Sequence, residues 1–117
     1  PFTPGFDVAG VVVALGADVP MIAPEVVLGS EVVVATGPTL GGHANVVTCK
    51  AVQATPKPSQ LDFAQACALP TVVLTVLDAF RKAGLRRGER ILIQSAAGGV
   101  GWAAMQIAAH LGARIYA

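Results

Sequence analysis

Residues 96–101, Ala-Ala-Gly-Gly-Val-Gly, have the residue types and the spacing of a turn that binds phosphate. They fit the pattern G-x-G-x-x-G with alanine at the first position. Gly98 would let a pyrophosphate approach the backbone closely, and Gly101 would let the following helix lie close to the preceding strand. The N–H groups of Gly99 and Val100 would donate to the phosphate at the positive end of the helix dipole. A tight turn that binds no ligand is the alternative interpretation.

This chemistry requires a strand before the turn and a helix after it, and the sequence predicts both. Residues 90–94 form a short apolar run typical of a strand, and residues 99–111 have helical periodicity. One helix face would pack on a sheet and the opposite face would be exposed; the first carries Val100, Ala104, Ile107, Ala108 and Leu111, and the second carries Trp102, Gln106 and His110. Residues 113–117 begin a second strand, so the segment is predicted to start a βαβ unit. The residue that would choose between NAD and NADP is expected about 20 residues after the turn, beyond residue 117.

The first half of the chain has a different pattern. Residues 8–15, 30–36 and 43–49 are short β-branched runs bounded by Gly, Pro or Asp, and they predict strands. After the sequence Pro-Lys-Pro-Ser at residues 56–59, two helical runs follow, with Ser59 as N-cap of the first and Gly84 at the end of the second. The sequence therefore predicts an all-β part over residues 1–58, a helical connector over residues 59–84 and the βαβ segment over residues 85–117.

The composition fits a compact globular protein and excludes several classes of function. The chain has 117 residues, of which 54% are hydrophobic and 13% are charged, and its net charge is +1. This balance gives no footprint for nucleic acid or an anionic membrane, and the one basic cluster, residues 81–90, is interpreted as a solvated loop. No apolar run reaches the ~18 residues of a membrane span. Cys49 and Cys67 do not suggest a disulfide framework, so we expect a reducing, cytoplasmic compartment.

Four segments, taken in order and at their spacing, carry a resemblance to a known family. They are TPGFDVAGVVVALGADV at residues 3–19, GGHANVVTC at 41–49, PKPSQLDFAQACALPTVVLTVLDAF at 56–80 and LRRGERILIQSAAGGVGWAAMQIAAHLGA at 85–113. Together they resemble the medium-chain dehydrogenase/reductase superfamily, and within it the zinc-independent quinone oxidoreductase branch, especially the enoyl reductase domains of type I polyketide and fatty acid synthases. The resemblance implies an α/β fold: part of a GroES-like β-barrel substrate domain over residues 1–58, followed by the start of a Rossmann dinucleotide-binding domain over residues 85–117.

The resemblance also implies an activity and a set of contacts. The activity is NADPH-dependent reduction of the double bond next to the carbonyl of a thioester that an acyl carrier protein holds, beside the other domains of a synthase. The implied cofactor-binding residues are Thr75, Ala97, Gly98, Gly99, Val100 and Gly101. For Thr75, a hydroxyl bonded back to its own helix is the alternative. No catalytic residue is assigned, because the family's proton donors and active-site tyrosine match no position of this sequence.

Two other functions stay open at this point. One is a stand-alone NADPH-dependent quinone or enone oxidoreductase, and the other is a non-catalytic, reductase-like remnant that serves structure or docking. The chain supplies only part of a cofactor cradle, since a Rossmann sheet needs several parallel strands covered on both faces. We therefore expect the isolated 117-residue chain to be inactive.

The residues at the family's zinc positions predict that no metal is bound. Zinc-dependent members have a His-Glu pair where this chain has Phe6 and Asp7, so the imidazole ligand is missing. A structural zinc site needs four closely spaced cysteines, and only two occur. We interpret His43 and His110 as structural or surface residues.

Overall fold

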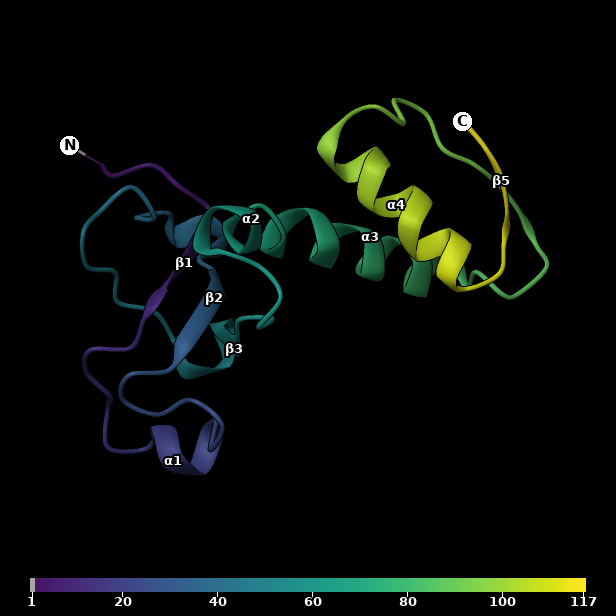
Figure 1. Cartoon of the computed structure of the whole chain (residues 1–117). Coiled ribbons are helices and arrows are strands. Elements are labelled where there is room, and N and C mark those ends of the chain that lie inside the picture. The colour runs from purple at the N-terminus through teal and green to yellow at the C-terminus, as the bar shows by residue number, and fades with distance from the viewer. Residues whose placement is uncertain (1) are drawn as a thin grey trace. The chain divides into compact units, whose positions relative to one another are not determined.

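The computed structural model describes residues 2–117 and is mixed α/β, as the sequence predicts. The elements follow one another as β1 (Asp7–Val11), α1 (Val19–Ile22), β2 (Glu31–Ala35), β3 (Ala54–Pro56), α2 (Phe63–Cys67), α3 (Pro70–Ala83), β4 (Arg90–Leu92), α4 (Gly99–His110) and β5 (Arg114–Tyr116) (Figure 1). Two short 3-10 turns lie at Gly37–Thr39 and Ala51–Gln53. The chain separates into two compact units between Thr71 and Val72. This division falls within α3, and the boundaries at residues 58 and 84 stay predictions.

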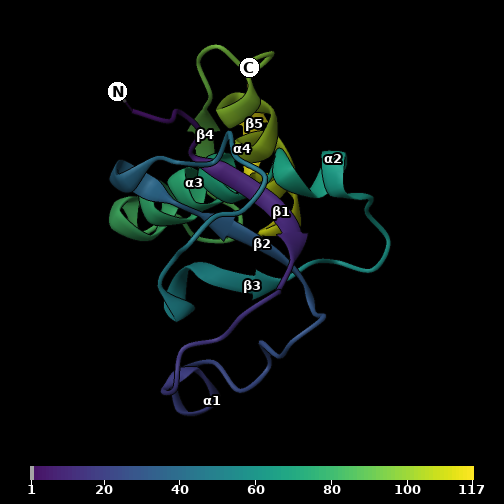
Figure 2. The ribbon, with the colours of Figure 1, turned by 90° about the vertical axis from the view of Figure 1, so that its left-hand side faces the viewer.

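The first unit is built on an antiparallel sheet in the order β1-β2-β3 (Figure 2). Because side chains alternate along a strand, Val32 and Val34 of the central strand point to one face, where they are buried. They form a core with Ala23, Val26 and Ala54. The predicted strands at residues 8–15 and 30–36 are confirmed as β1 and β2, although β1 ends at Val11, which pairs with the first residue of β2.

The prediction of a strand at residues 43–49 is wrong. This segment is irregular, and β3, which the sequence did not predict, pairs with β2 instead. With β1 on its other edge, the central strand has no free edge left. The valines of the segment, Val46 and Val47, line an apolar cavity of about 520 Å³ together with residues of β1 and β2. Val46 is nevertheless 71% exposed, so β-branched residues here accompany an irregular backbone, and their presence alone does not specify a strand.

The N-cap of α2 also differs from the prediction. Asp62 caps this helix, and Ser59 lies in the preceding turn. The carboxylate of Asp62 accepts from the N–H of Gln65 at 2.7 Å, and the Gln65 side chain accepts from the N–H of Asp62 at 3.2 Å. This reciprocal capping box satisfies two N–H groups at once, which explains why the helix begins three residues later than predicted.

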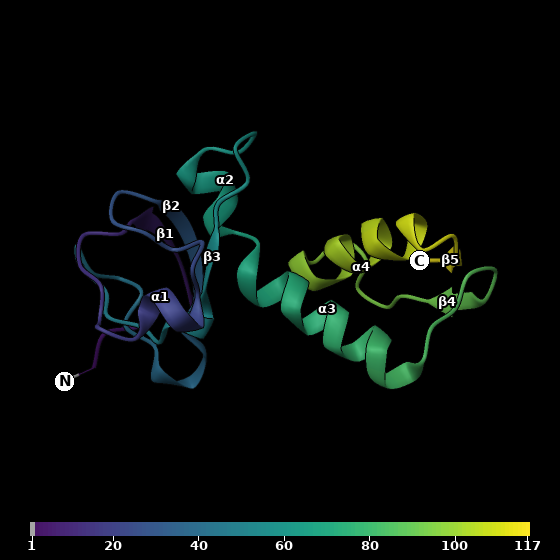
Figure 3. The ribbon, with the colours of Figure 1, turned by 90° about the horizontal axis from the view of Figure 1, so that it is seen from below.

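The second unit consists of most of α3, the parallel strands β4 and β5, and α4, which connects them (Figure 3). Ile91 pairs with Ile115, and both pack on a core of Val76, Ile93, Ala103, Ala104 and Ala108. Three of these core residues, Ala103, Ala104 and Ala108, are alanines of α4, and Ala96 and Ala113 in the flanking turns pack against them. Because these side chains are small, the backbone of α4 packs close to the strands, and few large side chains fill the space between them.

The predicted faces of α4 are confirmed in part. Ala104 and Ala108 are buried, and the opposite side with Trp102, Gln106 and His110 is exposed. Val100 and Leu111, predicted to lie inside, are 44% and 39% exposed. The buried line runs through Gly101, Ala104 and Ala108, and Val100 lies at its margin in the first turn, roughly 40° from Ala104 and roughly 100° from Gly101 around the helix. Leu111 is the C-cap, beyond the last helical residue.

Candidate functional site

The turn between β4 and α4 is closed by backbone hydrogen bonds. The N–H of Gly98 donates to the carbonyl oxygen of Ser95 at 2.9 Å, and the N–H of Trp102 donates to that of Gly98 at 2.8 Å, which begins the helix. Ser95 has a φ of +54°, a left-handed conformation that few residues other than glycine adopt. The tight bend thus falls one residue before the first motif position, and this explains why alanine is accommodated at Ala96.

Gly101 is required by the packing of this turn. A Cβ atom at this position would lie 2.3 Å from the carbonyl oxygen of Ser95 and 2.7 Å from the Cα of Ala96. Both distances are far inside van der Waals contact, and the atoms involved belong to the backbone. The third glycine of the motif therefore allows the close helix-to-strand approach that the pattern predicts.

Gly98 has a different environment. Its φ is −77°, which any residue adopts, and an added Cβ would meet only the Ser95 carbonyl oxygen, at 3.3 Å. The fold itself does not need glycine here. Residues 97–100 are all exposed, so the space beside Gly98 is open to a ligand.

The start of α4 has backbone donors that no side chain occupies. Gly98 is the N-cap, and it forms no side-chain cap. The first N–H groups of an α-helix have no partner within the helix, so those of Gly99 and Val100 point outward at the positive end of the dipole. An open glycine beside exposed donors fits a pyrophosphate, and the turn is therefore suited to a dinucleotide.

Thr75 lies on α3, where this helix passes the start of α4. The Cγ1 of Val72 would lie 3.4 Å from a Cβ at Gly99, so Val72 touches the turn. Thr75 is three residues further along, on the same side of α3, and it is exposed. The structure thus brings Thr75 within about one helical turn, 5.4 Å along α3, of the residue that contacts the site. The cofactor-binding role of Thr75, and of residues 97–101, stays a prediction.

Asp7 acts as a cap. Its Oδ1 accepts from the N–H of Thr71 at 2.7 Å, and it thereby satisfies a donor at the beginning of α3. Its carbonyl oxygen accepts from the Sγ of Cys67 at 3.6 Å. Phe6 beside it is 53% exposed. Asp7, at a position where zinc-dependent members have a Glu, thus has a structural role.

The titratable groups outside the turn include two histidines and two cysteines. Among residues 2–117, no group of three or more His, Cys, Asp and Glu side chains could hold a metal ion. His43 and His110 are both exposed. Burial raises the pKa of the Cys49 thiol, which makes its thiolate scarcer at neutral pH. Over the same described range, no helix is both long and apolar enough to cross a membrane.

The charges are distributed unequally along the chain. Up to Thr71 there are two lysines and five acidic residues, a net charge of −3, and from Val72 there are six cationic and two acidic residues, a net charge of +4. The first cationic residue is Lys50. The basic cluster at residues 81–90 is evident in the sequence, whereas Arg114, which pairs with Arg90 across the sheet, lies far from it along the chain. The net charge of each half of the chain, counted from the sequence, would have revealed this concentration of cations.

Known proteins resemble the chain over nearly its whole length. No protein-family model matches it. It is 42% identical over 114 residues to the spectinabilin polyketide synthase system protein NorB of Streptomyces orinoci, an alignment that covers 97% of this chain and 5% of that protein. It is 37% identical over 114 residues to 2-methylene-furan-3-one reductase of Solanum lycopersicum, with 95% of this chain and 29% of that protein covered.

Solved structures agree with these relatives. The CurK enoyl reductase matches with a TM-score of 0.85 and 35% identity, the quinone oxidoreductase of Coxiella burnetii with 0.84 and 34%, and a mycobacterial protein in complex with NADPH with 0.85 and 30%. These matches cover 97–98% of this chain and 33–36% of the other chains. The chain thus spans about a third of the solved proteins and a twentieth of the first synthase. By sequence and fold, the chain belongs to the medium-chain dehydrogenase/reductase superfamily, with the polyketide synthase enoyl reductases and quinone oxidoreductases as its relatives.

Proposed function

We propose that the whole protein is an NADPH-dependent enoyl reductase that reduces the α,β double bond of an acyl-carrier-bound thioester during polyketide or fatty acid synthesis. The observation that carries this proposal is the open turn at Gly98, with its exposed helix N-terminus, in a chain that aligns along 97% of its length with a polyketide synthase. Residues 1–58 are then part of a GroES-like substrate domain, and residues 85–117 begin a Rossmann domain. A cytoplasmic location belongs to the same proposal.

In this proposal the residues of the chain bind and position, and they perform no proton transfer. Gly98 leaves room for the pyrophosphate, and the N–H groups of Gly99 and Val100 donate to it. By the family resemblance, Thr75 would contact the nicotinamide side of the bound cofactor. NADPH, when bound, supplies the hydride that adds to the β-carbon of the enoyl thioester. Holding the two reactants in one orientation lowers the entropic part of the barrier, which is the main contribution that such a cradle makes.

One observation favours a second candidate, a stand-alone quinone or enone oxidoreductase. The 2-methylene-furan-3-one reductase is nearly as similar to this chain as the synthase is, at 37% against 42% identity. Substrate preference separates the two functions. The synthase function predicts turnover of a trans-2-enoyl pantetheine thioester in preference to a free enone, and the second candidate predicts the reverse order.

The cofactor assignment is tested by replacing Gly98. Gly98→Val in the whole protein should keep the fold, because an extended φ suits valine, and should weaken NADPH binding about tenfold or more by filling the space beside the turn. Energy transfer from Trp102, which is 59% exposed in the first turn of α4, to bound NADPH gives a direct binding signal. A parallel titration with NADH measures the cofactor preference.

Gly10→Val is the matched control. Gly10 lies on β1 in the first unit, and an added Cβ would meet no atom within 4 Å. This variant should bind NADPH as the parent does. Equal affinity of the parent and Gly98→Val would show that the turn is a structural bend without a ligand.

A further inference from the structure

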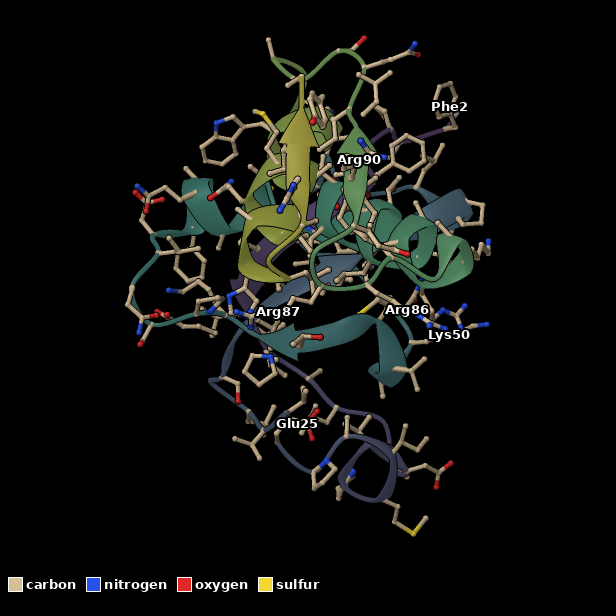
Figure 4. All side chains as sticks on the ribbon, turned by 90° about the vertical axis from the view of Figure 1, so that its right-hand side faces the viewer. Phe2, Glu25, Lys50, Arg86, Arg87 and Arg90 are labelled. Carbon is tan, nitrogen blue, oxygen red and sulfur yellow. The ribbon has the colours of Figure 1, made fainter. Side chains whose placement is uncertain are left out.

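Four arginines surround the end of the second unit at which β4 and β5 begin. Arg90 and Arg114 are the first residues of the two strands and pair directly across the sheet. Arg86 and Arg87 lie in the turn before β4, and all four are exposed. We name Arg86, Arg87, Arg90 and Arg114 the arginine patch. Figure 4 labels three of them and shows Arg86 and Arg87 projecting to opposite sides of the turn.

The backbone beneath the arginine patch is fixed. The N–H of Gly88 donates to the carbonyl oxygen of Gly112 at 2.9 Å, and the N–H of Arg114 donates to that of Glu89 at 2.7 Å. These bonds join the turn before β4 to the turn before β5. The stem of Arg87 lies over the second turn, since a Cβ at Gly112 would be 3.1 Å from its Cγ. The guanidinium groups are therefore presented from a rigid base, which lowers the entropy lost when a partner binds.

The guanidinium groups of the arginine patch have no acidic side-chain partners among residues 2–117. Three of the four other cations have acidic partners, because Lys57 pairs with Glu31, and Arg81 and Lys82 share Asp78. Within residues 2–117, none of the four patch arginines makes a side-chain ion pair or hydrogen bond. The nearby Glu89 carboxylate instead accepts from the backbone N–H of Arg86 at 2.7 Å. Like charges directly opposite across a sheet, as at Arg90 and Arg114, disfavour the folded state, so folding stability does not explain them.

The geometry indicates an extended acidic surface as the partner. Side chains that project to opposite sides of a turn cannot converge on one small anion. A nucleic acid is disfavoured by the carboxylate of Glu89 within the patch and by the low net charge of the chain, +1. Guanidinium groups bind carboxylates through paired hydrogen bonds. We propose that the arginine patch docks the acidic face of another folded protein domain.

The place of the patch agrees with docking and not with catalysis. The patch lies at the amino ends of the strands, and the cofactor turn follows the carboxyl end of β4. The 12 residues of α4 separate the two ends by about 18 Å. A partner on the patch would leave the turn open. The choice of a protein domain rests on the proposed function, because a synthase like NorB, of which this chain matches 5%, contains much further polypeptide.

The test compares two variants of the whole protein that change the net charge equally. Arg87→Ser with Arg114→Ser removes two charges from the patch, and Lys50→Glu changes the charge by the same amount at an exposed residue of the first unit (Figure 4). The probe is a fluorescent helical peptide with glutamates along one face and a net charge of −6. We expect the double variant to bind it about tenfold more weakly than the parent, and Lys50→Glu no more than twofold more weakly.

A single-stranded oligodeoxythymidylate of the same net charge is the second probe, and it should bind more weakly than the peptide. Tighter binding of the oligonucleotide would overturn the proposal, as would equal losses in the two variants or no binding of the peptide by the parent. Arg114→Ser should not lower the unfolding midpoint, because it removes a like-charge pair. Turnover of NADPH with a free pantetheine thioester should be unchanged in both variants, so that failure of the docking proposal and failure of the proposed function give different results.

Discussion

In the first unit, polar side chains bond to backbone groups far away in the sequence, whereas in the second unit small residues let backbone pack against backbone. Thr36, 1% exposed, donates its hydroxyl to the carbonyl oxygen of Gly5 at 2.9 Å. Gln53 donates its side-chain amide to the carbonyl oxygen of Ala35 at 3.1 Å. In the second unit, Gly101 lies against residues 95–96. The first arrangement depends on distant partners, and the second depends on local spacing, which a sequence displays directly.

Gly101→Ala gives the largest expected effect, because it tests the backbone contact on which the second unit depends. Its Cβ would lie 2.3 Å from the Ser95 carbonyl oxygen, so α4 must move away from the strand. We expect a loss of about 3 kcal/mol or more in the free energy of unfolding, measured by urea denaturation of the whole protein. Gly99→Ala is the control two residues away, where the new Cβ meets Val72 at an ordinary 3.4 Å. A similar midpoint for both variants would refute the requirement for close approach.

Thr36→Val tests the long-range hydrogen bonds of the first unit. The substitution keeps the shape of the side chain and removes the donor to the carbonyl oxygens of Gly5 and Phe6. Leaving buried acceptors with fewer partners should cost about 2 kcal/mol. Thr48→Val at an exposed position should change the stability by less than about 0.5 kcal/mol. Equal midpoints in urea would mean that backbone contacts alone hold this region.

The sequence predicted the second unit better than the first, because the second unit depends on local spacing and the first on partners that are distant in the sequence. The strand, the turn and α4 follow from a local pattern, and Gly101 has the packing role that its motif position indicates. A short stretch of sequence does not show which strands pair with one another. The pattern of residues 43–49 is therefore typical of a strand, although it is β3 that pairs with β2. Ser59 has a residue type typical of an N-cap, but the reciprocal hydrogen bonds with Gln65 that make Asp62 the N-cap are visible only in the structure.

The candidate site shows the same limit. The glycines at positions 98 and 101 could be assigned different roles from the motif, and the structure shows that only the second is needed for packing. That Val72 touches the turn, and thereby brings Thr75 near it, depends on the path of α3. The arginine patch needed the pairing of β4 with β5, because Arg114 lies 24 positions after Arg90 in the sequence.

Lys57→Met tests a second set of polar side-chain contacts in the first unit, and its expected effect is smaller. The Lys57 side chain is 5% exposed, its Nζ lies 3.0 Å from a carboxylate oxygen of Glu31, and it also donates to the carbonyl oxygen of Leu61. We expect a loss of about 1.5 kcal/mol in the free energy of unfolding by heat or urea, because the partly buried carbonyl of Leu61 loses its donor. Glu31 is 53% exposed, so Glu31→Gln should cost less than about 1 kcal/mol. A larger loss for Glu31→Gln than for Lys57→Met would show that the ion pair, and not the bond to the carbonyl, matters.

Asp78→Asn gives the smallest expected effect, because it alters an exposed cluster on α3 in the second unit. Hydrogen bonds from Lys82 and then Arg81 hold the pKa of Asp78 below its usual value. A carboxyl whose pKa is lower in the folded state stabilises the fold at pH values above its unfolded pKa, about 3.9, and loses this contribution as the pH falls through the folded pKa. The variant should therefore be slightly less stable than the parent at pH 7 and low salt, and the difference should vanish near pH 2 and in about 1 M salt, where charges are screened within about 3 Å. Glu25→Gln, at a residue of the first unit that makes no ion pair with another described residue (Figure 4), should show no such salt dependence. A difference for Asp78→Asn that persisted at high salt would mean that packing, and not charge, distinguishes this part of α3.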